Sequence, residues 1–188
     1  MENSTLIIII AVVIAIAAVT WLVLQKRRTE ALKSRFGPEY DRAIKEHGDA
    51  RKAEAVLGAR EKRVETYHVV TLNPADRDRF SAAWKAAQAH FVDSPKAAIE
   101  DADHLVTDVM KARGYPMADF EQRAADISVD HPTVVDNYRR AHSIALRNQQ
   151  EGATTEELRT AMVHYRTLFE ELLGTPAVEH AVHSEVRR

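Results

Sequence analysis

Apolar residues form one long run near the N-terminus and recur at helical spacing along most of the remaining chain. The run begins at Thr5, ends at Leu24 and holds twenty residues without a charge. A helix of that length rises about 30 Å, which matches the hydrocarbon core of a bilayer. The pattern therefore predicts one transmembrane helix within an N-terminal anchor, residues 1–25, with the lipid bilayer as its partner.

Residues at the ends of this run predict its direction. Trp21 lies near the C-terminal end, where an indole prefers the headgroup level, and three basic residues follow Gln25. Residues 1–4 contain no Lys or Arg. The positive-inside rule then places a single-pass protein in the cell membrane with its N-terminus outside and its C-terminal domain in the cytoplasm. The opposite topology is the alternative, whereas a cleaved signal peptide is disfavoured by acidic Glu2 and by the long apolar run.

Residues 26–66 predict a charged helical stalk. Gly37-Pro38 and Gly48 divide the segment into helices, and the last helix has a thin apolar face among many charges. Such a helix can pair with a second copy as a coiled coil, so self-association is one expectation for this segment.

Net charge differs between the two halves of the chain. Residues 26–65 hold 12 Lys or Arg against 8 Asp or Glu, and residues 66–188 hold 14 against 19. Acidic residues interleave with the basic ones after Glu30. We therefore expect weak adhesion to anionic lipids rather than a lipid-specific site, and we expect no nucleic-acid partner because a dense basic patch is missing from the sequence.

Residues 67–174 predict an all-α domain. A strand-like stretch, residues 67–72, has no partner strand in the sequence and is interpreted as a linker. Start signals follow at Asn73-Pro74, Ser94-Pro95, Pro116 and the capping box Thr154-x-x-Glu157. Apolar stripes at i, i+3, i+4, i+7 spacing between these signals predict an antiparallel bundle of four main helices plus one short helix. A flexible tail, residues 175–188, is expected to follow.

Metal chemistry has weak support in the sequence. A carboxylate-bridged dimetal bundle needs paired Glu-x-x-His elements, and the nearest match is a single Asp101-x-x-His104. His142 and His164 lie on helices beside apolar positions, and there is no cysteine. We predict no metal and no cofactor. The alternative, a small metal-binding or enzymatic bundle, would use Asp101, His104, His142 and His164.

Two linkers carry polar and aromatic residues that suit binding. They run from Arg113 to Pro116 and from Ser128 to Pro132, and they are expected at one end of the bundle. Since binding residues gather on loops of rigid scaffolds, we predict partner contacts at Tyr115, Asp119, Asp130 and His131. Ordinary turn chemistry is the alternative. No G-x-S-x-G, P-loop or G-x-G-x-x-G motif is present, so no catalytic residue is predicted.

Several runs carry a resemblance to known proteins. They are FGPEYDRAIKEHGD, FVDSP, VMKARGYP, DFEQRAAD, VDHP and AMVHYRTLFEELLG. Together they resemble a set of bacterial membrane-anchored helical proteins of unknown function, usually catalogued as hypothetical or secreted. The resemblance implies a membrane anchor but no activity, and the secreted label keeps the opposite topology open.

These patterns favour a membrane-tethered binding protein, acting as an adaptor or an assembly factor. A protein partner or self-association is expected, because the chain combines an anchor with a helical domain that carries no catalytic motif. The alternatives are the metal-binding or enzymatic bundle and an envelope-facing structural protein.

Overall fold

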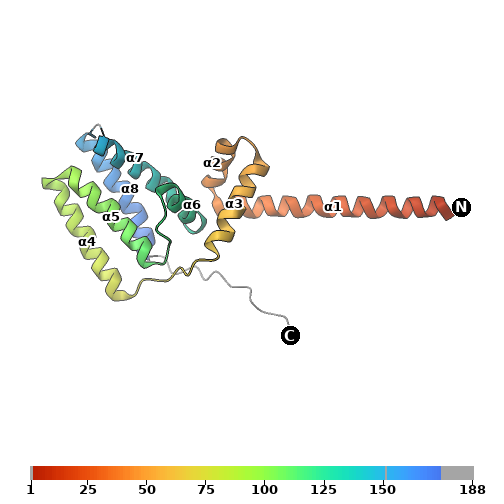
Figure 1. The fold of residues 1–188 in the computed structure, drawn as a ribbon, viewed down its shortest axis with the longest axis horizontal. Coiled ribbons are helices and arrows are strands. Elements are labelled where there is room, and N and C mark those ends of the chain that lie inside the picture. Colours follow the sequence, from red (N-terminus) through yellow and green to blue (C-terminus); the bar gives the residue numbers. More distant parts are fainter. Residues whose placement is uncertain (1, 151, 175–188) are drawn as a thin grey trace. The chain divides into compact units, whose positions relative to one another are not determined.

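The protein is all-helical in the computed structural model, which describes residues 2–150 and 152–174 (Figure 1). Within those ranges there are eight helices and no strand. The predicted all-α class is thereby confirmed. The helices are α1 (Glu2–Phe36), α2 (Pro38–His47), α3 (Ala50–Val64), α4 (Pro74–Asp93), α5 (Pro95–Ala112), α6 (Phe120–Asp130), α7 (Val135–Gln150) and α8 (Thr155–Gly174).

The chain divides into two compact units between Gly58 and Ala59. The first contains α1, α2 and the beginning of α3, and the second contains the end of α3 with α4 to α8. We describe each unit by itself.

The first unit begins with an unbroken 35-residue helix, α1. Its apolar part is long and apolar enough to cross a membrane, and no residue of that apolar window is buried. The helix continues past the basic cluster and ends at Phe36. Gly37 then adopts a positive φ of 47°, a conformation that glycine reaches without steric cost, and the chain turns into α2.

α2 and α3 double back toward α1. Gly48 ends α2 in the left-handed region, and its N–H donates to the carbonyl of Ile44 at 2.8 Å. Asp49 then caps α3, since its carboxylate accepts from the backbone N–H groups of Arg51 and Lys52. Apolar side chains of this unit that are buried include Leu32, Phe36, Tyr40, Ala43 and Ala53.

The second unit is built on four long helices. α4 packs against α5, α5 against α8, and α8 against α7, while the shorter α6 contacts α7 (Figure 1). α5 and α8 run in the same direction, because Asp103 meets Tyr165 near their middles and Arg113 meets Leu172 near their ends. Large core residues of this unit include Phe80, Trp84, Ile99, Val106, Tyr138, Tyr165, Phe169 and Leu172.

The linker predicted before α4 has no regular secondary structure. Its Val70 N–H donates to the carbonyl of Arg113 at 2.8 Å, so it lies against the end of α5. Gly114 has a φ of 91°, and a Cβ there would lie 2.4 Å from the carbonyl oxygen of His68. Only glycine fits at this close approach of two backbones.

The short helix begins later than the sequence suggested. We expected a start at Pro116, but α6 starts at Phe120 because the Asp119 carboxylate accepts from the Gln122 N–H at 2.8 Å. The capping box before α8 is confirmed, since the Glu157 carboxylate accepts from the Thr154 N–H at 2.9 Å. The predicted flexible tail, residues 175–188, lies outside the described residues.

Candidate functional site

Two of the predicted metal candidates lie in a groove between α4 and α5. Asp101 and His104 line a cavity of about 410 Å³ together with His90 and Asp108. His90 Nδ1 lies 2.8 Å from Asp101 Oδ2, and both side chains are about half exposed. In the described ranges no three His, Asp or Glu side chains gather closely enough to hold a metal ion.

The other two candidates have separate partners. His142 stacks on Phe120 with ring centroids 3.7 Å apart, and its Nδ1 lies 3.6 Å from Asp103 Oδ1. His164 Nδ1 lies 2.7 Å from the Asn137 side-chain oxygen. Burial, followed by the charge of Arg140, lowers the pKa of His164, so this ring is predominantly neutral near pH 7. Aromatic and amide contacts of this kind position both histidines in the fold.

The structure brings the two predicted linkers together. The Tyr115 hydroxyl donates to Asp130 Oδ2 at 2.9 Å, and His131 Nδ1 lies 3.1 Å from Glu171 Oε1. Tyr115 and His131 are nevertheless almost fully buried. Asp119 stands apart from this contact as the N-cap of α6.

A buried arginine lies at the centre of these linker contacts. Arg113 is 1% exposed, and its Nη1 donates to the carbonyl of Leu172 at 2.8 Å. This carbonyl lies in the last turn of α8, where backbone carbonyls have no hydrogen-bond donor within the helix. Burial lowers its pKa, and the charges of Asp130 and Glu171 oppose the shift. Burial also lowers the pKa of His131, although the hydrogen bond that its ring donates to Glu171 acts in the opposite direction. The cluster joins the ends of α5, α6 and α8 inside the unit.

A second groove, between α4 and α8, was not identified from the sequence. It encloses about 370 Å³, and a stacked aromatic pair forms its floor, with the Trp84 and Phe169 ring centroids 4.6 Å apart. The complete lining is Arg77, Ser81, Trp84, Lys85, Gln88, Arg166, Phe169, Glu170, Leu173 and Gly174.

Basic side chains surround this floor. Three cations, Arg77, Lys85 and Arg166, face one acid, Glu170, which accepts a hydrogen bond from Arg166 Nε at 2.7 Å. Trp84 is 5% exposed, and its buried indole N–H has no hydrogen-bond partner in the described residues. The groove therefore offers an aromatic floor and a positive rim, which are features of a binding surface, while the indole N–H lies buried beneath it.

The groove depends on which helices are neighbours. Along α4 its polar residues recur at Arg77, Ser81, Lys85 and Gln88, beside the apolar stripe that includes Trp84. The polar stripe can be found in the sequence of α4. That it lines a groove can be recognised only once α8 is known to lie beside α4.

Comparison of the chain with protein-family models, with curated proteins and with solved structures finds no match.

Proposed function

We propose that this protein is a membrane-tethered binding protein, an adaptor or assembly factor, whose second unit docks a protein partner in the α4–α8 groove. The observation that carries the proposal is the stacked floor of Trp84 and Phe169 beneath three cations. Trp and Arg are the residue types most enriched among those that dominate the energy of protein interfaces.

In this proposal α1 is the tether. It crosses the bilayer between Thr5 and Leu24, with its N-terminus outside and the second unit in the cytoplasm. Support comes from the length of the apolar helix, from Trp21 near its end and from the basic cluster that follows. Residues 26–66 connect the tether to the domain.

The domain itself, residues 67–174, is proposed to form one bundle that acts as a rigid scaffold. Its long helices share a continuous buried core, to which Ile99, Tyr138, Tyr165 and Leu172 contribute. A rigid scaffold lowers the conformational entropy lost when a partner binds.

The net charge of the groove favours a partner segment of opposite charge. Since Glu170 is already paired with Arg166, the groove presents a net positive rim. A segment that combines an apolar anchor for the aromatic floor with acidic flanking residues is therefore favoured over a basic one.

Photocrosslinking in native membranes tests the proposal. A photoreactive amino acid replaces Ser81 in the groove or, as the matched control, exposed Ser143 on α7. We expect one discrete protein adduct from Ser81, absent from Ser143 and lost when Lys85→Glu and Arg166→Glu reverse the rim charge. Equal adducts at both positions, or none at Ser81, would overturn the docking surface.

The same membranes test topology. The chain contains no cysteine, so a single Ser143→Cys carries the only thiol. We expect a membrane-impermeant maleimide to label it only after cells are opened. Labelling of intact cells would support the envelope-facing alternative instead.

A further inference from the structure

A cleft in the first unit adjoins the end of its apolar helix. It encloses about 430 Å³ between α1 and α3. All of its residues belong to this unit. The lining consists of Trp21, Leu24, Gln25 and Arg28 of α1 with Arg51, Glu54 and Ala55 of α3.

Two lining residues of α3 carry opposite charges. Arg51 and Glu54 are three residues apart, so their Cβ atoms lie about 5–6 Å from each other on one face of the helix. Within residues 10–150 and 152–174, neither forms an ion pair with the other or with a third residue. The cleft therefore presents one open cation and one open anion on neighbouring turns.

Glu54 is held in place by two hydroxyl groups. Its Oε1 accepts from Thr29 at 2.7 Å and from Tyr40 at 2.9 Å. Burial, followed by the hydrogen bond to Glu54, raises the pKa of Tyr40 to about 12, so the phenol keeps its proton near pH 7 and remains a donor. The second carboxylate oxygen, Oε2, makes no hydrogen bond to the part of the chain that the structure describes, and it is not buried. This oxygen can accept a hydrogen bond from a molecule in the cleft.

The guanidinium of Arg51 is open as well. The Asp49 carboxylate caps α3 by accepting from the backbone N–H groups of Arg51 at 2.7 Å and Lys52 at 3.1 Å. Asp49 makes no ion pair with the Arg51 side chain in the described ranges, and both residues are exposed, so water screens their attraction. The side-chain donors of Arg51 are therefore available to a ligand.

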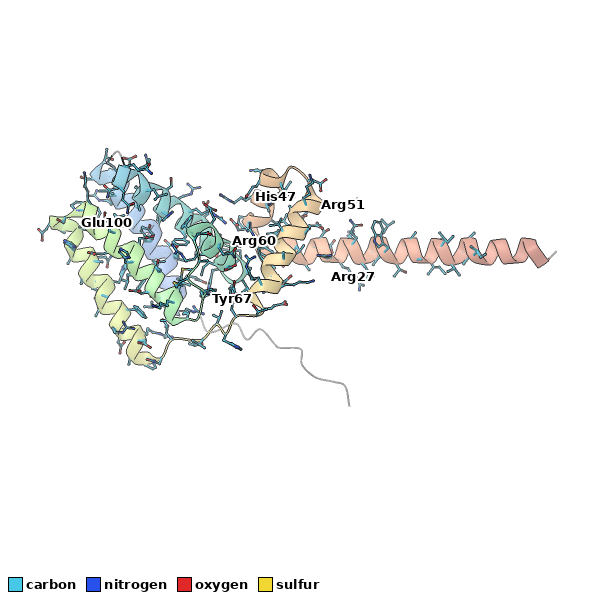
Figure 2. All side chains as sticks on the ribbon, viewed as in Figure 1. Arg27, His47, Arg51, Arg60, Tyr67 and Glu100 are labelled. Carbon is cyan, nitrogen blue, oxygen red and sulfur yellow. The ribbon has the colours of Figure 1, made fainter. Side chains whose placement is uncertain are left out.

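The lining becomes polar in the direction away from the apolar run. Trp21 and Leu24 belong to the last turn of that run, and Figure 2 labels Arg51 at the end of α3 nearer to it. Glu54 lies farther along, because it bonds Thr29, which is about 8 Å beyond Leu24 on the helix axis. If α1 spans a bilayer, this interval matches the headgroup layer of one leaflet, which is roughly 5–8 Å thick.

We propose that this cleft binds one phosphatidylethanolamine molecule. Its phosphate contacts Arg51, and its ammonium contacts Glu54 Oε2. The start of an acyl chain lies against Trp21 and Leu24, so the order of groups in the lipid follows the order of the lining residues. This inference rests on the membrane tether of the proposed function.

The chemistry of the headgroup matches the two charged side chains. A guanidinium donates to phosphate oxygens, and a primary ammonium has three N–H donors for a carboxylate. The two-carbon linker between the phosphate and the ammonium of this lipid suits side chains whose Cβ atoms lie about 5–6 Å apart.

Other molecules satisfy only part of this site. Phosphatidylglycerol has no ammonium and places its negative charge beside Glu54. The quaternary ammonium of phosphatidylcholine has no N–H to donate to the carboxylate. Free phosphoethanolamine carries both charged groups but has nothing to place against Trp21. The site therefore selects a primary ammonium that is joined to an acyl chain.

Native mass spectrometry of the full-length protein tests this selection. The protein is reconstituted into phosphatidylcholine bilayers that contain equal minor fractions of phosphatidylethanolamine and phosphatidylglycerol, and the lipids retained after release are identified. We expect one retained phosphatidylethanolamine, favoured about tenfold over phosphatidylglycerol, because a hydrogen bond to a charged group contributes about that factor. Equal retention of the two lipids would overturn the site.

Glu54→Gln removes the charge and keeps the contacts of this residue, since an amide oxygen still accepts from Thr29 and Tyr40. We expect this variant to lose the preference for phosphatidylethanolamine. The matched control is Glu46→Gln, which removes the same charge from an exposed position of α2 outside the cleft and should keep the preference. Equal loss in both variants would assign the preference to net charge and overturn the site.

Ala55→Phe blocks the cleft without altering its charge. Ala55 is exposed and lines the cleft, so a phenyl ring there takes the space of the lipid. We expect this variant to lose the retained phosphatidylethanolamine, and unchanged retention would overturn the location. Displacement of the lipid by soluble phosphoethanolamine would overturn the lipid as the ligand.

Alkaline extraction from pure phosphatidylcholine vesicles separates the two proposals. A protein that stays in the membrane but shows no preference for phosphatidylethanolamine refutes the lipid site alone. A protein that is extracted refutes the tether.

Discussion

Replacing Asp126 by alanine should destabilise the second unit more than replacing any surface carboxylate. Asp126 is 1% exposed, and its carboxylate accepts from Arg63 Nε at 2.9 Å and Nη2 at 2.7 Å. It also accepts from the Tyr67 hydroxyl at 3.0 Å and the Gln122 side chain at 2.7 Å. Figure 2 labels Tyr67 in the linker that follows α3. Without the carboxylate, four donor groups on three side chains lose their acceptor.

The expected loss of unfolding free energy depends on how deeply the ion pair is buried. Removing one partner of a fully buried ion pair costs about 3–5 kcal/mol. Because the Arg63 side chain is 36% exposed, water can solvate part of its guanidinium, and we reduce the expected loss to about 2–3 kcal/mol. For a unit of this size, that corresponds to a decrease in Tm of roughly 8–15 °C.

Thermal denaturation of the full-length protein in detergent, followed by near-ultraviolet circular dichroism, measures this loss. Asp136→Ala is the matched control, because Asp136 pairs with Arg140 at the same 2.7 Å but both side chains are at least half exposed. We expect less than about 0.5 kcal/mol for the control. Equal Tm changes for the two variants would refute the argument that burial sets the strength of the Asp126 contacts.

Two further predictions concern the Arg113 end of the unit. Gly114→Ala should lower Tm by at least 5–10 °C, which corresponds to roughly 1–3 kcal/mol of unfolding free energy. The reason is that the φ of 91° and the His68 carbonyl oxygen, 2.4 Å from the position of a Cβ, leave no room for the added methyl group. An unchanged melting curve would contradict this close approach of the two backbones. Burial lowers the pKa of His131, so the imidazole binds a proton more readily in the unfolded chain than in the folded one. The free energy of unfolding should therefore fall as pH drops below about 6.5, by at most ~1.4 kcal/mol per pH unit. His131→Gln should flatten that slope in Tm measured between pH 8 and 5, and an equal slope would assign the pH dependence to other groups.

Helices could be predicted because their signals are local. Apolar residues at helical spacing predict a helix, and the caps at Asn73 and Thr154 predict where it begins, without knowledge of tertiary contacts. Pro116 misled the prediction of the short helix because proline permits a helix start without requiring one. The side chain of Asp119, three residues before Gln122, supplied the stronger signal.

Sites were harder to predict because they join distant segments. The sequence did suggest that the two linkers lie together, and Tyr115 does contact Asp130. It gave no sign that these residues are buried, since burial depends on Arg113 and on the end of α8.

The first unit folds back on itself, although it contains enough residues to extend far beyond the apolar run. As a straight helix, the segment from Gln25 to Gly58 would extend about 50 Å. Instead, Gly58 lies beside Arg28, only one turn beyond the apolar run. The first unit therefore uses most of its length to form a compact fold instead of an extended stalk. If α1 is the proposed tether, the chain leaves this unit close to the end of the apolar run, and a longer linker between residues 65 and 73 would extend the reach of the helices that follow.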